Sequence, residues 1–253
     1  MKTVYHLKLH QEMLEGAEFA LLPGDPARVE KIALSYDRQA RHLASHREFT
    51  SFLGYLDTVP VLTMSTGIGG PSTAIVVEEL AMLGVDTFIR IGTTGAIQKN
   101  IQVQDVIITT ASVRLDGTST HYAPIEYPAV AHYLIVQALV AAARSLNIPH
   151  HVGITASSDS FYPGQERYDS FSGSVIRKFQ GSLKEWQTLG VLNYEMESST
   201  LFTVCSALGL RAGCISGVIV NRVVENQIQE DAISPAEEKT MRVAVEALRR
   251  LVK

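Results

Sequence analysis

The chain has 253 residues, of which 46% are hydrophobic, and its formal net charge is −4. This length allows one large α/β domain or two small ones, with enough apolar residues for a substantial core. The charge balance gives no sign of a nucleic-acid surface or a basic membrane patch, and two cysteines are too few for a disulfide framework. No apolar run approaches the ~18–20 residues of a membrane span, and residues 1–13 lack the apolar region of a signal peptide. We therefore expect a protein of the reducing cytoplasm.

Short apolar runs along the chain predict buried strands. Several of these runs are continuous rather than alternating, which is typical of strands covered on both faces. The expected strands are Phe19–Leu22, Pro60–Ser65, Thr87–Gly92, Val106–Thr110, Val152–Ala156 and Cys214–Val220.

Helix signals follow most of these runs. Asp25 and Pro26 are typical of an N-cap followed by proline at the first helical position, and Ser234–Glu237 has the pattern of a capping box. Strands that alternate with helices predict a mostly parallel sheet wrapped by helices, in one domain. The expected helices are Ala27–Leu34, Pro71 to Gly84, Ala129–Leu146, Glu197–Leu208 and Ser234 to Leu251.

Arg90 is the most informative single residue, because it lies inside the apolar run Thr87–Gly92. A guanidinium keeps its proton, so a buried arginine needs an anion or a dense set of acceptors. The glycines and threonines of Gly92–Ala96 predict a turn with backbone N–H groups, which is typical of an anion pocket. On this segment alone, an anionic ligand and a structural carboxylate are equally good partners for Arg90.

Two other expected strand-to-helix junctions, Pro23–Arg28 and Thr66–Pro71, also contain glycine. A helix N-terminus exposes N–H groups, Gly24 allows close approach, and Arg28 adds a charge. Taken alone, each junction fits a tight turn as well as it fits an anion site. Arg47, taken alone, lies in an ordinary polar segment. Ligands of open α/β sheets bind beyond the carboxyl ends of strands, so several arginines among glycines there predict phosphate.

The segment Asn193–Glu197 carries two carboxylates just before an expected helix. In an extended chain Glu195 and Glu197 point the same way, which suits acid–base work or the hydroxyls of a sugar. Helix capping is the alternative for this pair.

The segment Phe161–Arg167 combines aromatic, amide and cationic side chains. A glutamine both donates and accepts while an arginine only donates, so Gln165 and Arg167 can read the edge of a planar amide such as a nucleobase, with Phe161 stacking. A polar surface loop is the simpler alternative for this segment by itself.

Taken together, five segments resemble the bacterial uridine phosphorylases of the nucleoside phosphorylase superfamily in sequence, order and spacing. The resemblance spans nearly all of residues 1–253 and implies a single α/β domain with a mixed, partly barrel-like central sheet flanked by helices. It is weakest between Val224 and Ser234, where the family would have a mobile flap. The five segments are Pro23–Pro26, Ser45–Phe49, Arg90–Gly95, Phe161–Arg167 and Asn193–Glu197.

The resemblance implies reversible phosphorolysis of uridine to uracil and ribose 1-phosphate, with inorganic phosphate as co-substrate and no organic cofactor. It implies catalytic roles for Arg90, Gln165, Arg167 and Glu197. The implied phosphate ligands are Gly24, Arg28, Arg90 and Thr93, with Arg47 from a neighbouring subunit. The implied nucleoside contacts are Thr94, Gly95, Phe161, Gln165, Arg167, Glu195, Met196, Glu197 and Arg222, with His6 from the same neighbour.

Sites shared between subunits imply a homo-oligomer, with a dimer as the minimal unit and a hexamer built as a trimer of dimers. The resemblance also implies a monovalent cation, such as potassium, at the dimer interface near Glu48, Ile68 and Ser72. No nucleic acid or membrane partner is expected.

Three alternatives remain on the sequence alone. A purine nucleoside phosphorylase would carry an aspartate after the late strand, where this chain has Asn221 and Arg222. A nucleosidase would use water, and the retained arginines disfavour it. A non-catalytic sensor on the same fold would be distinguished from an enzyme by its lack of phosphate-dependent turnover.

Overall fold

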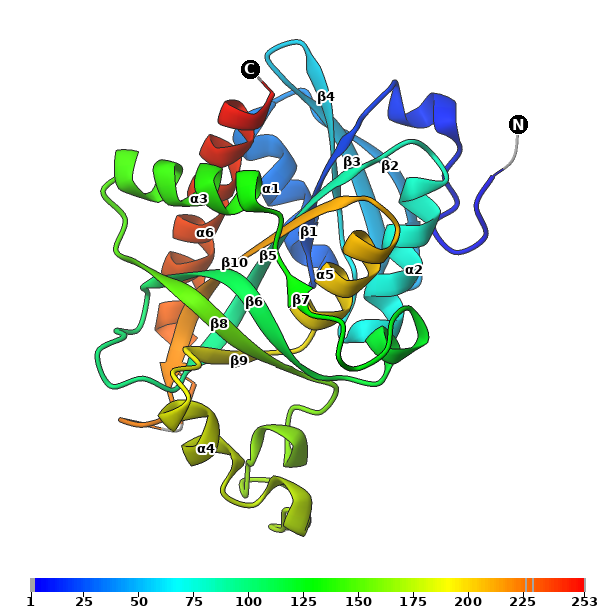
Figure 1. Ribbon diagram of the computed structural model, residues 1–253. Helices are drawn as coiled ribbons and strands as arrows, with labels where there is room; N and C mark the ends of the chain where they lie inside the picture. The colour runs from blue at the N-terminus through cyan, green and yellow to red at the C-terminus, as the bar shows by residue number, and fades with distance from the viewer. Residues whose placement is uncertain (1–2, 226, 229, 253) are drawn as a thin grey trace.

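The computed structural model describes residues 3–225, 227–228 and 230–252 (Figure 1). Its strands join in one ten-stranded sheet in the order β10-β6-β8-β9-β5-β1-β4-β3-β2, with β7 beside β6. The strands are β1 (Phe19–Pro23), β2 (Arg41–His46), β3 (Phe49–Leu56), β4 (Val59–Met64), β5 (Thr87–Ala96), β6 (Val106–Leu115), β7 (Ala129–Val130), β8 (His150–Ser158), β9 (Asn193–Glu195) and β10 (Arg211–Asn221). The helices are α1 (Val29–Tyr36), α2 (Gly70–Ala81), α3 (Tyr133–Ser145), α4 (Ser182–Thr188), α5 (Ser198–Ala207) and α6 (Glu230–Leu251).

Five strands close into a barrel, because β5 pairs with both β10 and β9. Around the ring, β10 is antiparallel to β6, β6 is parallel to β8, and β8 is parallel to β9. From β5 the sheet continues outward through β1 and β4 to the β3–β2 hairpin. The mixed, partly barrel-like sheet is confirmed, whereas the mostly parallel sheet expected from alternation alone is wrong.

Helices cover the sheet on two sides (Figure 1). One apolar cluster joins α2 and α5 to the sheet through residues such as Leu80 and Phe202. A second cluster joins α1, α3 and α6 through residues such as Ile32, Leu139 and Leu248. Burying one such side chain contributes about 1.5–3 kcal/mol, so both layers stabilise the strands whose ends form the site described below.

Two helix predictions are wrong at their starts. Ala129 and Val130 form β7 against β6 rather than helix, so α3 begins only at Tyr133. The terminal helix begins at Glu230, and Pro235 lies inside it instead of in a first turn after a cap at Ser234. Proline removes only one backbone bond there, while Ala232 is buried and extends the apolar face of α6 before it.

The expected turn after Arg90 is also wrong, because β5 continues to Ala96. The glycines of this stretch serve close approach instead. A Cβ on Gly92 would lie 3.0 Å from the Ser216 hydroxyl, and one on Gly95 would lie 3.2 Å from Arg222 Cδ.

The β2–β3 hairpin was not expected from the sequence. His46 pairs with Phe49, so Arg47 and Glu48 form its tip, and Arg47 has a left-handed backbone with a φ of 56°. The hairpin places Arg47 on the surface.

A bulge interrupts the pairing of β10 with β5. Val218 is opposite Thr94 and Val220 is opposite Gly95, so Ile219 is an extra residue between them. A bulge bends a strand and re-aims its side chains, and this one lies where β10 reaches the site.

No helix among the described residues is long and apolar enough to cross a membrane. The segment expected as a flap, Val224 to Ser234, is helical from Glu230 on. Residues 226 and 229 of that segment lie outside the described residues, as do residues 1–2 and 253 of the expected 1–253 domain.

Candidate active site

A cavity of about 700 Å³ lies where the ends of β1, β5, β9 and β10 meet the start of α1. It gathers most of the predicted site residues, although they come from distant parts of the chain. Those on its wall are Gly24, Arg28, Glu48, Ile68, Arg90, Thr93, Thr94, Gly95, Phe161, Gln165, Arg167, Glu195, Met196 and Glu197.

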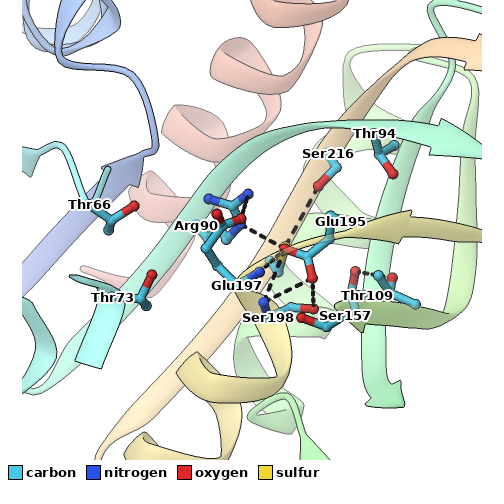
Figure 2. Close-up of polar contacts among 12 residues, drawn as sticks. Thr66, Thr73, Arg90, Thr94, Thr109, Ser157, Glu195, Glu197, Ser198 and Ser216 are labelled. Carbon is cyan, nitrogen blue, oxygen red and sulfur yellow. Dashed lines mark hydrogen bonds and ion pairs between the residues drawn. The ribbon is translucent and has the colours of Figure 1, made fainter. Parts of the chain in front are cut away.

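Arg90 of β5 is held by both predicted carboxylates (Figure 2). Its Nε lies 3.0 Å from Glu195 Oε2, and its Nη2 forms an ion pair with Glu197 Oε2. Its Nη1 is buried and has no hydrogen-bond partner among the described residues. The structural alternative is therefore confirmed for two nitrogens of Arg90, which meet carboxylates, and an anionic ligand at the third stays a prediction.

Glu195 also caps the start of α5. Its carboxylate accepts hydrogen bonds from the backbone N–H of Glu197 at 2.9 Å and of Ser198 at 2.9 Å. The Ser198 hydroxyl is in turn 2.7 Å from the Ser112 hydroxyl of β6. A carboxylate at a helix N-terminus is favourable, so capping is confirmed for Glu195.

Glu197 has a different environment. Its Oε1 accepts a hydrogen bond from the Gly69 backbone N–H at 2.6 Å, at the start of α2. Burial raises the pKa of the Glu197 carboxyl, and Arg90 opposes this shift while Glu195 adds to it. Burial also acts to lower the pKa of Arg90, but the carboxylates of Glu197 and Glu195 outweigh burial and raise it. Arg90 is therefore a permanent charge in this site.

Arg28 lies at the same end of the cavity, just after the N-cap formed by Asp25, whose carboxylate accepts from the Ala27 N–H at 2.9 Å. Arg28 Nη1 donates to the Ile91 carbonyl at 3.2 Å, and Nε pairs with Glu237 at 3.1 Å. Its Nη2 is buried without a partner in the part of the chain that the structure describes. Burial lowers the pKa of Arg28, with Glu237 opposing and Arg90 reinforcing that shift.

Gly24 lies beside Arg90, four residues before Arg28 in the chain, and its lack of a side chain leaves space at this end of the cavity. A Cβ there would lie 3.9 Å from Arg90 Nη1 and 3.3 Å from the Gly67 carbonyl. Two buried, unpartnered guanidinium nitrogens beside a glycine form a cradle for an anion. We call this part, made by Gly24, Arg28, Arg90 and Thr93, the phosphate end, after the ligand predicted from the sequence.

The opposite part of the cavity carries Phe161, Gln165 and Arg167, and we call it the base end. The guanidinium of Arg167 lies 4.3 Å from the centre of the Phe161 ring. Arg167 is 3% exposed, and its Nε has no hydrogen-bond partner among the described residues. Burial lowers the pKa of Arg167, although Asp169 opposes this.

Backbone contacts position the base end. Arg222 Nη1 donates to the Gln165 carbonyl at 2.7 Å, and Glu166 has a left-handed backbone with a φ of 51°. The Glu166 carboxylate accepts hydrogen bonds from the backbone of Gly181 and, at 2.7 Å, of Leu183 at the start of α4. Arg222 therefore lies behind this turn rather than on the cavity wall, and burial followed by Arg167 lowers its pKa to about 10.

Three further predicted residues lie away from the cavity wall. His6 Nδ1 is 2.7 Å from Glu79 Oε1, Arg47 is exposed at the hairpin tip, and Ser72 donates to the Ile68 carbonyl at 3.1 Å. Sequence reasoning assigned His6 and Arg47 to a neighbouring subunit, and both are accessible on this one.

The residues of the predicted cation site surround Gly67. Gly67 has a left-handed φ of 69°, and a Cβ at this position would lie 2.6 Å from Glu48 Cγ and 3.5 Å from Ser72 Oγ. Together with the Ile68 carbonyl, this set contains only oxygen donors, which fits a hard cation. No group of three or more histidine, cysteine, aspartate or glutamate side chains is placed to hold a metal within the described ranges.

Sequence reasoning missed several residues of the wall. Ile219 and Val220 fall in a predicted strand, but only the bulge brings both to the cavity. Glu237 was assigned to a capping box, and no sequence signal pointed from α6 to Arg28. Ile228 and Ile233 were also missed. Five other wall residues lie in segments singled out from the sequence but had no role in the site assigned to them: Asp25, Pro26, Gly67, Gly92 and Tyr194.

A barrel of this topology with an arginine-lined cavity at its strand ends is the arrangement expected of a phosphorylase, and the phosphorylase superfamily model matches residues 18–253. The chain belongs to the phosphorylase superfamily. Uridine phosphorylase of Escherichia coli is 58% identical over 249 residues, covering 98% of both chains. Uridine phosphorylase of Haemophilus influenzae is 58% identical over 252 residues, covering 100% of both. A guanosine phosphorylase of Halorubrum lacusprofundi is 38% identical over 222 residues, covering 88% of this chain and 86% of the relative. The resemblance identified from the five segments is confirmed.

Proposed function

We propose that this protein catalyses the reversible phosphorolysis of uridine to uracil and ribose 1-phosphate. The observation that carries the proposal is the pair of buried, unpartnered nitrogens, Arg90 Nη1 and Arg28 Nη2, facing one cavity. The relatives that match over nearly the whole chain are named uridine phosphorylases, which supports uridine as the nucleoside. Inorganic phosphate is the co-substrate, and the reaction requires no organic cofactor.

Phosphate is the nucleophile in this proposal. Arg28 and Arg90 bind its oxygens with Gly24 and Thr93, and the backbone of β1 and β5 fixes their positions. The carboxylates of Glu195 and Glu197 keep Arg90 from turning, so phosphate is held in line with the anomeric carbon of the ribose.

Glu197 and Met196 hold the ribose, next to the backbone of Thr94 and Gly95. The Thr94 hydroxyl donates to the Tyr194 carbonyl at 2.6 Å and accepts from Asn193 at 2.7 Å. These bonds tie β5 to β9, so the ribose contacts come from a rigid part of the barrel. A carboxylate near the ribose also stabilises the positive charge that develops as the glycosidic bond breaks.

Uracil leaves with negative charge on its ring. Arg167 and Gln165 donate to the leaving base, and because both side chains are already buried in the cavity wall they stabilise this charge at little reorganisation cost. Phe161 stacks beside the base, and Arg222 positions Gln165 through its carbonyl.

The base end suits a pyrimidine better than a purine. A purine leaves readily when an acid protonates its ring, and the aspartate expected for that task is replaced by Asn221. The Asn221 amide is already engaged, donating to the Gln98 carbonyl at 2.9 Å and the Ile101 carbonyl at 2.7 Å.

The test is uracil release from uridine with and without inorganic phosphate, with inosine run in parallel. Release that needs phosphate supports the proposal. Release without phosphate indicates a nucleosidase, turnover of inosine alone indicates a purine enzyme, and no turnover of either indicates a sensor.

We further propose that the whole chain 1–253 is one domain acting in the cytoplasm as a homo-oligomer. Dimers share their sites, and a hexamer is a trimer of such dimers. Arg47, at an exposed hairpin tip, and His6 reach the cavity of the neighbouring subunit.

Subunit mixing tests the shared site. In a mixed dimer of Arg90→Ala and Arg47→Ala chains, one site carries both lesions and the other carries neither. We expect each variant alone to be inactive and the refolded mixture to regain phosphate-dependent activity. Mixtures no more active than their components would contradict the sharing of Arg47.

The same interface is the proposed site of a monovalent cation such as potassium, held by Glu48, the Ile68 carbonyl and Ser72. If so, replacing potassium by a bulky organic cation lowers thermal stability of the wild type. Ser72→Ala should reduce that dependence, and an unchanged dependence would contradict the site.

A further inference from the structure

Glu237 is a third carboxylate near the phosphate end. It belongs to α6, lines the cavity, and pairs with Arg28 Nε at 3.1 Å. Its side chain is 20% exposed, whereas those of Glu195 and Glu197 are 1% and 5% exposed. Of the three carboxylates that pair with Arg28 and Arg90, Glu237 is therefore the one that can turn to water without leaving a charge buried.

The three guanidinium nitrogens of Arg28 have different partners. Nη1 donates to the Ile91 carbonyl, Nε pairs with Glu237, and Nη2 has none in the described part of the chain. Nε and Nη2 point along one edge of the planar group, the edge that binds two oxygens of a carboxylate or a phosphate side by side. Glu237 therefore occupies half of that edge, and the other half is open.

Arg90 cannot exchange partners in the same way. Its corresponding edge, Nε and Nη2, is held by Glu195 and Glu197, which are both buried. Removing the arginine from them would leave uncompensated buried charges, which is strongly unfavourable. Of the two arginines, Arg28 is the one whose side-on edge is available to a ligand.

The Glu237 carboxylate and a bound phosphate compete for Arg28 because both are negatively charged. Two arginines, Arg28 and Arg90, pair with three carboxylates, Glu195, Glu197 and Glu237, so this ion-paired group has a formal charge of −1 even before Asp25 and Glu48 of the same cavity are counted. A phosphate group adds roughly −1.5 to −2 at pH 7. Placing it a few ångströms from Glu237 costs Coulomb energy that the release of Glu237 removes.

We infer that Glu237 stands in for phosphate: it pairs with Arg28 in the free enzyme and releases Nε when phosphate binds. The inference rests on the proposed function, because it requires phosphate at Arg28. Glu237 keeps the buried guanidinium paired between turnovers and thereby lowers the affinity for phosphate. The exchange also removes the ion pair that joins α6 to Arg28. Because Ile233 of α6 lines the same cavity, a movement of α6 would change the cavity wall.

Direct binding of inorganic phosphate, measured by calorimetry without nucleoside, tests this exchange. We expect Glu237→Gln to bind phosphate about two- to fivefold more tightly than the wild type, the range expected for losing a partly exposed ion pair. Glu237→Asp, with a shorter reach to Arg28, should fall between them. In steady-state kinetics, KM for phosphate should fall from the wild type to Glu237→Asp to Glu237→Gln. KM for uridine should be the same in all three.

Two control variants separate the possible outcomes. Glu238→Gln, an exposed neighbour on α6, should bind phosphate like the wild type, and Arg28→Ala should bind it far more weakly. Equal or weaker binding by Glu237→Gln, with normal binding by the wild type, would mean that Glu237 only positions Arg28; this overturns the inference and leaves the function intact. A wild type that neither binds phosphate nor needs it for uracil release would overturn both.

Discussion

The two ends of the cavity hold their arginines by different means. At the phosphate end, Arg90 is fixed by two buried carboxylates from β9 and the start of α5. At the base end, Arg167 lies against the Phe161 ring, and the carboxylate nearest to it is Asp169, 3.9 Å away and 54% exposed. One end is a charged network inside the barrel, and the other is a cation on a turn outside it.

The difference follows from when each ligand becomes charged. In the proposed reaction, phosphate arrives as an anion, so the arginines that bind it need counter-charges to remain stable while the site is empty. Uracil becomes negative only as the bond breaks, so donors that are aimed but not neutralised serve it best. We therefore expect stability and activity to depend on the same contacts at the phosphate end and on different contacts at the base end.

The largest expected effect is that of Arg90→Ala. Loss of a preorganised donor should lower kcat/KM by about 100- to 1000-fold. Glu195 and Glu197 would be left without their cation, so the free energy of unfolding should also fall by about 3–5 kcal/mol. Kinetics and urea unfolding measure the two effects. Arg211→Ala, which breaks a surface pair with Asp86, is the control and should cost no more than about 1 kcal/mol. Loss of activity without loss of stability would break the comparison.

Arg167→Ala should be as damaging to rate and almost neutral to stability. We expect kcat/KM for uridine to fall by about 100- to 1000-fold, because a donor to the leaving base is lost. The unfolding midpoint should barely move, since no buried carboxylate depends on Arg167. Arg177→Ala, an exposed arginine further along the same connection, should change neither quantity. A destabilisation as large as that of Arg90→Ala would contradict the distinction.

Gln165→Ala should have a smaller and more selective effect. Losing one neutral hydrogen bond to the base should raise KM for uridine by about tenfold. KM for phosphate should stay the same, because Gln165 lies at the other end of the cavity. Equal increases in both constants, from initial rates with each substrate varied, would count against base recognition by Gln165.

The smallest effect concerns Glu79, which belongs to neither end and holds His6. Burial acts to raise the pKa of Glu79, but hydrogen bonds from the backbone of His6 and Leu7 and from the His6 ring outweigh it and lower the pKa. A lowered pKa contributes stability above the unfolded value of about 4.5, and this is lost as the pH falls through the folded value.

Glu79→Gln should therefore be less stable than the wild type at pH 7 by about 1 kcal/mol. The difference in thermal midpoint should shrink as the pH falls below about 4.5. A constant difference across that range would show that the charge of Glu79 is not what stabilises the N-terminal segment.

Much of the framework could be predicted from sequence, because continuous apolar runs and N-caps are local signals. The strand at Phe19–Pro23, the cap at Asp25 and the burial of Arg90 all belong to this class. The five segments also identified the wall of the site, since their order and spacing match a known superfamily. The roles of the individual site residues remain predictions.

Other features depend on contacts that no local pattern encodes. The turn expected after Arg90 is a strand because β1, β9 and β10 pair along β5. The β2 strand lacks a clean apolar alternation, so its pairing with β3 was missed. The ion pair between Arg28 and Glu237 joins residues more than 200 positions apart in the sequence (237 − 28), and it forms only because α6 packs on the barrel.

The bulge at Ile219 has a consequence for how this chain tolerates change. Strand side chains alternate between faces, so the extra residue sets the direction of everything after it in β10. Deleting one residue there would turn Asn221 and Arg222 each to the face opposite the one it now occupies. The hydrogen bonds from Arg222 to the Gln165 carbonyl and from Asn221 to the Gln98 carbonyl would then be lost. A substitution at Ile219 changes only the shape of the cavity wall, whereas an insertion or deletion there reverses the orientation of every later side chain in the strand.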